Sequence, residues 1–545
     1  MPILTPHCKG QNRMTQTCGE ILVERLESYG IEIVFGIPGV HTVELYRGLP
    51  NTRLRHITPR HEQGAGFMAD GYARATGKPA ACFIISGPGM TNIVTAMAQA
   101  YSDSVPMLVI SSVNNSHELA LGQGRLHELP SQRQLVAGVS VFSHTVARPD
   151  ELDEVLARAF TVFDSARPGP VHIELPLDVI TATVTSSKAQ TIATRYRPAP
   201  SGPAVTAAAD LLKNAANPLI VLGGGTQDAA QQAQALVERS GIRTVLTINA
   251  KGVIPPDHPL NLGSRLPQPP VLQAIQSADV VLAIGTELGE TDTLLFDDQL
   301  NIEGQVIRVD IDPEQLTRNV LPTISICADA GLTLQALYEA MQDCRPFQHQ
   351  SEVAALRQAS DALAPEAYFK HGQFLALVAE TLPEVIIVGD STQPVYGGNL
   401  FYEAANPRSY FNSSTGYGTL GFGLPAAFGA KLALPQRHVV SLIGDGGLQF
   451  TIGELATAVE LNLAVPVLVW NNNGYGEIKK YMVDRAIPAI GVDIYTPDFI
   501  AIAKGFGCAA IKVSSKAEFV EALQNASSSA VPTLIDIPED LALAW

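Results

Sequence analysis

Short apolar runs rich in β-branched residues alternate with amphipathic stretches along most of the chain. Each run ends in a turn of glycine, proline or a polar residue, and the turn leads into a helical pattern. The clearest runs cover residues 31–39, 80–89, 105–112, 171–179, 217–225, 384–392, 439–447 and 465–476. Runs without polar alternation are typical of strands buried on both faces, and their alternation with helices indicates βαβ units. The pattern therefore predicts an α/β protein with doubly wound parallel sheets.

The runs fall into three groups that polar segments separate. The first separator is the Ser/Thr/Pro-rich stretch 181–203, and the second lies around 344–352. We predict a disordered lead-in 1–14, an N-terminal domain 15–182, a central domain 200–343 and a C-terminal domain 366–545. Ligands of parallel sheets bind beyond the carboxyl ends of the strands, so we expect the chemistry in the turns that come after the strands.

Composition narrows the classes of partner. The 545 residues carry a formal net charge of -17, which argues against nucleic acid or an anionic membrane as a partner. No apolar run approaches the roughly 20 residues of a membrane-spanning helix, and the N-terminus lacks the apolar core of a secretory signal. The 6 cysteines show no C-x-x-C spacing, which fits reduced thiols. We therefore expect a cytoplasmic protein.

One pair of turns combines a carboxylate with glycines. In VVSLIGDGG, residues 439–447, Asp445 follows a strand, and Asn472 follows the next apolar run 27 positions later. The helical pattern between them is long enough to connect two adjacent parallel strands, so both side chains are expected at one edge of a sheet. Carboxylate and amide oxygens suit Mg²⁺, and glycines let a diphosphate approach the backbone. The simpler alternative is that Asp445 only caps a helix.

Several motifs together resemble the thiamine-diphosphate-dependent enzymes, in the branch of acetohydroxyacid synthase, pyruvate oxidase and benzoylformate decarboxylase. The motifs are FGIPG, RHEQGAGFMADGYAR, SGPGMTN, RPGPVHIELPLDV, VIRVDID, GYGTLGFGLPAA, GDGGLQF and WNNNGYG. The resemblance covers nearly all of residues 15–545. It implies pyrimidine-binding, central and diphosphate-binding domains, with thiamine diphosphate and Mg²⁺ as cofactors. It also implies an active site shared between the first domain of one subunit and the third domain of its neighbour, hence a homodimer at minimum and an expected homotetramer.

The resemblance assigns roles to individual residues. Glu62 matches the glutamate that hydrogen-bonds the cofactor's pyrimidine, although without the family it could simply complement a helix dipole. Gly418 matches the carbonyl that accepts from the cofactor's amino group, and Leu420 matches the residue that bends the cofactor. The implied metal ligands are Asp445, Asn472 and the backbone oxygen of Gly474. Further cofactor contacts are implied for Pro38, Gly39, Gly87, Asn92, Ser391, Thr392, Gln393, Gly446, Gly447 and Tyr475.

Enzymes of this family differ in the fate of the intermediate that remains once a 2-oxo acid has lost carbon dioxide. The C2 carbanion of the cofactor attacks the keto carbon, and decarboxylation leaves an enamine. Protonation of the enamine gives an aldehyde, attack on a second 2-oxo acid gives an acetohydroxyacid, and oxidation needs a flavin.

Departures from the acetohydroxyacid synthase pattern favour the aldehyde outcome. GTELGETDT (285–293) is acidic where that enzyme carries G-A-R-F-D-D-R near its flavin, so bound FAD is doubtful. Pro130 stands where the enzyme has its active-site glutamine, and Tyr481 stands where it has a tryptophan.

Three residues suggest the substrate. GRLHELPSQ (124–132) matches a loop on the substrate side of the pocket in relatives and offers His127 and Glu128, while Glu477 follows the metal-binding turn. Two carboxylates would favour a cationic substrate through charge-assisted pairing. This loop and FGIPGVHTVELYRG resemble the decarboxylases of 5-guanidino-2-oxopentanoate, the 2-oxo acid of arginine. We expect conversion of that acid to 4-guanidinobutanal, a step of arginine catabolism.

Other interpretations remain open at this stage. Glu128 could be a solvated loop residue and His127 a packing residue. The chain could be an acetolactate synthase that joins two pyruvates, or a flavin or nicotinamide oxidoreductase that uses turns such as G-x-G-x-x-G at 416–421. A non-catalytic relative would have lost groups that the chemistry requires, but Glu62, Asp445 and Asn472 are all present.

Overall fold

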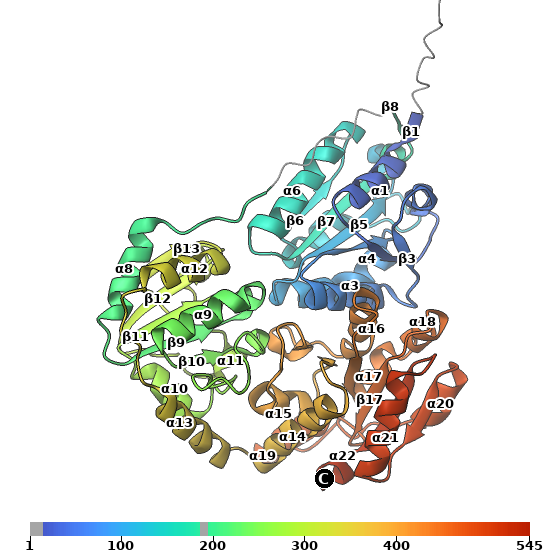
Figure 1. Ribbon diagram of the computed structural model, residues 1–545. Coiled ribbons are helices and arrows are strands. Elements are labelled where there is room, and N and C mark those ends of the chain that lie inside the picture. The colour runs from blue at the N-terminus through green and yellow to red at the C-terminus, as the bar shows by residue number, and fades with distance from the viewer. Residues whose placement is uncertain (1–14, 186–194) are drawn as a thin grey trace, which may run out of the picture.

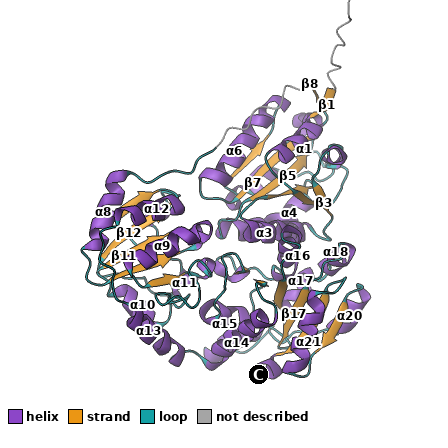
Figure 2. Ribbon diagram, in the orientation of Figure 1, coloured by secondary structure: helices purple, strands orange, loops and turns teal. Residues whose placement is uncertain are grey.

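The computed structural model describes residues 15–185 and 195–545, which form three α/β units (Figure 1). The predicted disordered lead-in, residues 1–14, lies outside the described residues. Each unit contains one parallel sheet with helices against it, so the predicted fold class is confirmed (Figure 2). None of the helices among the described residues has the length and apolar character needed to cross a bilayer.

The N-terminal unit is a six-stranded sheet in which every pairing is parallel. Its strands, in spatial order, are β3 (Arg55–Ile57), β2 (Ile33–Gly36), β4 (Ala80–Ile84), β5 (Met107–Val113), β7 (Pro170–Pro176) and β6 (Phe142–Thr145). Its helices are α1 (Cys18–Ser28), α2 (Val43–Tyr46), α3 (Glu62–Thr76), α4 (Pro88–Ser102), α5 (Gln132–Leu135), α6 (Leu152–Ser165) and α7 (Leu177–Ile180). A short antiparallel pair, β1 (Thr15–Thr17) with β8 (Thr183–Thr185), joins the two ends of this unit.

The central unit is a five-stranded parallel sheet with the order β10 (Thr244–Leu246), β9 (Pro218–Leu222), β11 (Val280–Ile284), β12 (Gln305–Asp310) and β13 (Ile324–Cys327). Its helices are α8 (Gly202–Lys213), α9 (Ala230–Ser240), α10 (Pro269–Gln276), α11 (Glu290–Thr293) and α12 (Ala330–Ala340). The polar segment after it, predicted only as a separator, also contains a helix, α13 (Gln350–Ala362), which packs on α10 through the buried Val353. The domain boundaries given from the sequence remain predictions.

The C-terminal unit is a six-stranded parallel sheet with the order β15 (Tyr410–Asn412), β14 (Ile386–Gly389), β16 (Val439–Gly444), β17 (Pro466–Asn471), β19 (Thr533–Pro538) and β18 (Ala509–Lys512). Its longer helices are α14 (Glu366–Thr381), α15 (Gln393–Phe401), α16 (Gly423–Ala433), α19 (Gly476–Asp484) and α21 (Lys516–Ser527). Its shorter helices are α17 (Asp445–Thr451), α18 (Glu454–Glu460), α20 (Phe499–Gly505) and α22 (Glu539–Ala542).

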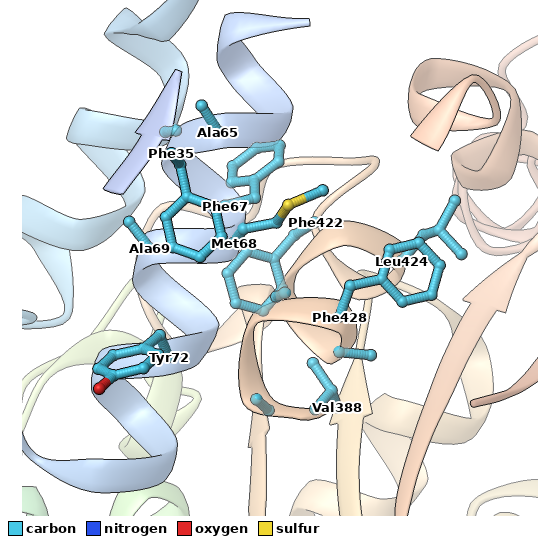
Figure 3. Packing of buried hydrophobic residues seen from close by; sticks show 14 of the residues in the cluster. Phe35, Ala65, Phe67, Met68, Ala69, Tyr72, Val388, Phe422, Leu424 and Phe428 are labelled. Carbon is cyan, nitrogen blue, oxygen red and sulfur yellow. The ribbon is translucent and has the colours of Figure 1, made fainter. Parts of the chain in front are cut away.

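The N-terminal and C-terminal units share one hydrophobic core along α3 and α16 (Figure 3). Phe67 of α3 meets Phe422, next to α16, edge to face with ring centroids 5.5 Å apart. The backbones also approach closely, because a methyl group on Gly71 or Gly429 would overlap a carbonyl oxygen of the other helix. This contact packs the N-terminal unit directly against the C-terminal unit.

Candidate active site

Asp445 lies where β16 ends and α17 begins, and its side chain is buried with 1% of the residue exposed. The carboxylate accepts from the backbone N–H of Asn472 (3.4 Å) and from the hydroxyl of Thr496 (3.3 Å). Strands β16 and β17 are parallel neighbours, so the two strand-end turns meet at one edge of the sheet. Burial raises the pKa of Asp445, and a nearby cation would offset that cost.

Asn472, whose backbone N–H donates to this carboxylate, carries a second candidate oxygen ligand in its side chain. Its Nδ2 donates to Oε1 of Gln393 (3.0 Å), whereas its buried Oδ1 has no hydrogen-bond partner among the described residues. Gly474 comes two residues later, and a side chain there would overlap the carbonyl oxygen of Val492. A buried carboxylate next to a buried, unpaired amide oxygen fits an oxygen-binding cation such as Mg²⁺. Residues 15–185 and 195–545 contain no cluster of three or more His, Cys, Asp or Glu suited to a metal.

Glu477 lies within this group of polar side chains. Its carboxylate accepts from Nε2 of Gln393 (3.3 Å) at Oε2 and from the hydroxyl of Tyr368 (3.2 Å) at Oε1. Burial, then the nearby charge of Glu477, raises the pKa of Tyr368, so this hydroxyl stays protonated and can donate. The structure thus brings the predicted Glu477 and Gln393 together with the predicted metal ligands.

The turn predicted to hold the diphosphate surrounds a buried carboxylate. Asp390 accepts from the backbone N–H groups of Ser391 (2.8 Å) and Gly423 (2.9 Å), and burial raises its pKa to about 6. Thr392 caps the start of α15 without a side-chain hydrogen bond to the helix, and a methyl group on Gly447 would lie 3.2 Å from Asp390. Sequence reasoning did not select Asp390, although its place in the strand-end turn VGDST was a usable signal.

Tyr475 explains the glycine next to Asp445. A methyl group on Gly446 would lie 2.6 Å from the Tyr475 ring, so glycine is required for this ring to pack over the first turn of α17. Tyr475 immediately precedes α19, which carries Glu477.

Glu62 is the first residue of α3, and one of its oxygens accepts from Nδ2 of Asn92 on α4 (2.9 Å). The turn before it is held by Glu454 of α18, whose carboxylate accepts from the backbone N–H groups of Arg60 and His61 (both 3.0 Å). Glu454 was not predicted, because nothing in its local sequence shows that it caps a turn nearly four hundred residues earlier. Asn92 thus holds the carboxylate of Glu62, while Glu454 of the C-terminal unit holds the backbone turn that precedes it.

His127 lies beside the Gly87 turn that precedes α4. Gly87 has φ +66, and a methyl group there would lie 2.8 Å from the carbonyl oxygen of His127, so only glycine fits. The ring of His127 meets His41 edge to face at 5.1 Å, and Nδ1 of His41 is 2.6 Å from the hydroxyl of Ser86. Sequence reasoning missed His41, which lies in the quoted motif FGIPGVHTVELYRG. Burial and then the charge of His127 lower the pKa of His41.

Glu128 is directed into its own loop. Its carboxylate accepts from the backbone N–H groups of Gly122 (2.8 Å), Arg125 (2.9 Å) and Gln123 (3.3 Å). These bonds, that of Arg125 foremost, lower the pKa of Glu128. The loop therefore places His127 at the Gly87 turn, while Glu128 makes no hydrogen bond or ion pair with the Glu62 or Asp445 groups among the described residues.

The remaining predicted cofactor contacts lie in two separate places. Gly39, after Pro38, packs directly against Ile85 at the N-terminal sheet. The loop with Gly418 and the half-exposed Leu420 instead packs near the other end of α4, because the backbone N–H of Thr419 donates to Gln99 (3.3 Å).

Within one chain, Glu62 and the predicted cofactor contact Gly418 lie apart. Among the described residues, no hydrogen bond or ion pair connects the Glu62 group with the Asp445 group. A methyl group on Gly416 would contact Ser102, which is 10 positions from Asn92 and hence about 15 Å away along α4. Gly418 and Glu62 therefore lie at opposite ends of this helix.

The central unit meets the other two around a cavity of about 270 Å³. Arginines in its lining are paired with carboxylates, for example Arg167 with Glu287 and Arg74 with Asp103. Asp292, from the acidic stretch 285–293, also lines the cavity, and burial raises its pKa to about 6. The expectation that FAD is doubtful stays a prediction.

Comparison of the chain with models of protein families identifies its family. Residues 16–135 match the thiamine pyrophosphate enzyme N-terminal TPP binding domain, residues 205–337 match the central domain, and residues 390–537 match the C-terminal TPP binding domain. The chain belongs to the thiamine pyrophosphate enzymes. The three matches also cover the glycine turns on which the flavin or nicotinamide oxidoreductase alternative rested.

Individual relatives of this thiamine pyrophosphate enzyme span nearly its whole length. A protein described as probable 2-ketoarginine decarboxylase from Pseudomonas aeruginosa is 44% identical, over 97% of this chain and 95% of the relative. The acetolactate synthase isozyme 1 large subunit of Escherichia coli is 33% identical, over 96% of this chain and 94% of the relative. A probable acetolactate synthase large subunit of Methanocaldococcus jannaschii is 32% identical, over 96% and 92%. The chain is thus a thiamine pyrophosphate enzyme of the 2-oxo acid decarboxylase and acetolactate synthase type.

Proposed function

We propose that this enzyme decarboxylates 5-guanidino-2-oxopentanoate without oxidation, giving 4-guanidinobutanal and carbon dioxide, with thiamine diphosphate and Mg²⁺ as cofactors. The observation that carries the proposal is the likeness over 97% of the chain to a probable 2-ketoarginine decarboxylase. A carboxylate next to the inferred metal site, Glu477, supports the choice of a cationic substrate.

In this proposal Asp445, Asn472 and the backbone oxygen of Gly474 hold Mg²⁺. Thiamine diphosphate would supply a nucleophilic carbon and an electron sink for the electron pair that remains when carbon dioxide leaves. Glu62 provides a carboxylate for the pyrimidine, and Asn92 orients it by donating to one of its oxygens (2.9 Å). The buried surroundings of Asp445 exclude water from the charged end of the site.

Glu477 is the better placed of the two candidate carboxylates for the guanidinium group. Each of its oxygens accepts one hydrogen bond, from Gln393 and from Tyr368, and a carboxylate oxygen has a second lone pair that can accept from a guanidinium. The oxygens of Glu128 instead already accept from three backbone N–H groups of one loop. A substrate role for Glu128 stays a prediction, and we expect that residue mainly to shape the loop beside His127.

The experiment that tests the substrate is an assay of the purified enzyme with both cofactors and a panel of 2-oxo acids. We expect 5-guanidino-2-oxopentanoate to give the highest kcat/KM and an aldehyde as product. Glu477→Gln should reduce the preference for the guanidino acid over a neutral acid of similar length by about ten- to hundredfold, the value of one charged hydrogen-bonded pair. Glu366→Gln, which removes an exposed carboxylate paired with Lys370, is the matched control and should change this preference little. Equal preference in wild type for the neutral acid would contradict the proposal.

A second candidate function is acetolactate synthesis from two molecules of pyruvate, because two acetolactate synthase subunits are 33% and 32% identical to this chain. The same assay separates the two functions. Pyruvate as the preferred substrate with acetolactate as product would favour this alternative and remove the role of Glu477 in selectivity.

We infer, from the position of Glu62 and Gly418 at opposite ends of α4, that the complete site forms between two copies of the chain. A homodimer is then the minimum active unit, and a homotetramer is the expected assembly. The cytoplasmic location stays a prediction.

A further inference from the structure

The geometry points to a polar relay, formed by Tyr368, Glu477, Gln393 and Asn472, that fixes the amide of Asn472 with its oxygen toward the metal. We propose Gln393 and Glu477 as positioning residues for this metal ligand. The inference rests on the proposed function only in that it assumes a cation at Asp445 and Asn472. It does not depend on which 2-oxo acid is the substrate.

An asparagine ligand has an orientation problem that a carboxylate lacks. A rotation of the Asn472 amide by half a turn would exchange the oxygen for an NH₂ group, which carries hydrogen-bond donors and repels a cation. Nδ2 of Asn472 donates to Oε1 of Gln393 (3.0 Å), and this bond holds Oδ1 on the opposite side. The buried Oδ1 indeed has no partner among the described residues, which leaves it available for a metal.

Gln393 has the same ambiguity, and Glu477 resolves it. Nε2 of Gln393 donates to Oε2 of Glu477 (3.3 Å), and an ionised carboxylate can only accept. If Gln393 rotated, its oxygen would face the carboxylate and its NH₂ group would face the NH₂ group of Asn472. Both contacts would then be repulsive, so the carboxylate at one end of the relay selects the orientation of both amides.

Tyr368 holds the carboxylate itself. Its hydroxyl donates to Oε1 of Glu477 (3.2 Å) and comes from α14, while Glu477 comes from α19 and Gln393 begins α15. The relay therefore links three helices to the turn after β17. Positions fixed by separate elements of a packed scaffold vary little, which a metal site of defined geometry requires.

The relay needs an acceptor at position 477 but not a negative charge. In Glu477→Gln the amide can present either its oxygen or its NH₂ group to Gln393, because the Tyr368 hydroxyl can accept or donate in return. Two orientations of the relay then compete, which costs only about a factor of two in the population with the Asn472 oxygen toward the metal. Glu477→Leu removes the acceptor altogether. The two variants therefore separate positioning of the metal ligand from attraction of a cationic substrate, which needs the charge.

Manganese binding tests the relay directly. Mn²⁺ would be titrated into metal-free enzyme in saturating thiamine diphosphate, and free Mn²⁺ would be measured by electron paramagnetic resonance. We expect Glu477→Leu and Gln393→Leu to weaken Mn²⁺ binding about ten- to hundredfold, as for other groups that orient a metal ligand. Tyr368→Phe should weaken it less, and Glu477→Gln should bind within about threefold of wild type. Gln335→Leu, on the exposed surface of α12 where Gln335 contacts Glu339, is the control and should bind like wild type.

Unchanged Mn²⁺ affinity in Glu477→Leu would overturn the relay, as would a loss in Glu477→Gln equal to that in Glu477→Leu. Gln393 is also a predicted diphosphate contact, and Gln393→Leu could fail to fold. In either case the two Glu477 variants and Tyr368→Phe test the relay without it. Selectivity for the guanidino acid is measured on the same variants. If Mn²⁺ affinities follow the predicted order but wild type does not prefer the guanidino acid, the relay stands and the proposed substrate is wrong. If wild type prefers the guanidino acid but Mn²⁺ affinities do not follow that order, the proposed substrate stands and the relay is wrong.

Discussion

Among the described residues, the carboxylate of Glu62 accepts one hydrogen bond, from Nδ2 of Asn92 (2.9 Å). Glu62→Gln preserves an oxygen that can accept from Asn92 but removes the charge. We expect kcat to fall by about 10²- to 10⁴-fold, the usual contribution of a proton-transfer group, with an unchanged thermal midpoint. Steady-state kinetics with calorimetry would check both. The control is Glu44→Gln, which breaks a surface pair with Arg47 and should leave kcat unaltered.

His371 of α14 carries a pH-dependent cost to stability. It is 2% exposed, neither ring nitrogen has a partner among the described residues, and burial lowers its pKa to about 4. The unfolded chain takes up this proton below about pH 6.5 and the folded chain only below about pH 4, so stability falls as the pH decreases from 6.5 to 4. Asp390, whose pKa burial raises to about 6, has the opposite effect in part of this window.

A variant isolates the histidine from such background groups. His371→Leu should raise the thermal midpoint, and the increase should be larger at pH 5.0 than at pH 7.5 by the equivalent of about 2 kcal/mol. Differential scanning calorimetry of both proteins at the two pH values would measure this difference. An increase that is the same at both pH values would mean that His371 is not buried in its neutral form.

At the scale of elements, the contact between α3 and α16 decides how the two outer units meet. A methyl group on Gly71 would overlap the carbonyl oxygen of Ala426, and backbone atoms cannot move aside as a side chain can. Gly71→Ala should therefore destabilise the enzyme by about 1–3 kcal/mol or more, despite the better helix propensity of alanine. The thermal midpoint and resistance to limited proteolysis would show the loss.

The matched control for this contact is another helical glycine. Gly505, exposed at the end of α20, has open space around its missing side chain, so Gly505→Ala should leave the midpoint unchanged or slightly higher. Equal effects of the two substitutions would show that close packing of α3 on α16 does not limit stability.

Elements with a strong local signal were predictable from the sequence, and long-range contacts were not. The run 439–447 contains β16 and then Asp445 because its apolar β-branched residues and glycines act locally. Helix α13 was missed because its polar sequence hides a single buried face around Val353. Residues such as Tyr368 and Glu454 contact the site only through tertiary packing, which spacing along the chain does not encode. Glu128 was selected from its charge and from the likeness of its loop to a substrate-side loop of relatives, and the structure shows that its carboxylate accepts from backbone N–H groups of that same loop.

At the scale of the whole molecule, the inference that the site forms between two copies makes a prediction about assembly. Glu62→Gln and Asp445→Asn should each inactivate the enzyme. If every site takes Glu62 from one copy and Asp445 from another, equal co-expression of the two variants leaves about a quarter of the sites intact, because each intact half occurs with a probability of one half. If a single chain holds the whole site, the same mixture has no intact site.

The control places both substitutions in the same chain. Co-expression of wild type with the double variant, Glu62→Gln with Asp445→Asn, should also leave about a quarter of the sites intact when sites form between copies, but about half when each chain holds its own site. Activities of the two mixtures, measured per cofactor-saturated chain, should therefore be equal in the first case. Zero activity in the mixture of the two single variants, together with half activity in the mixture of wild type and double variant, would contradict the inference. Each chain would then hold a complete site of its own.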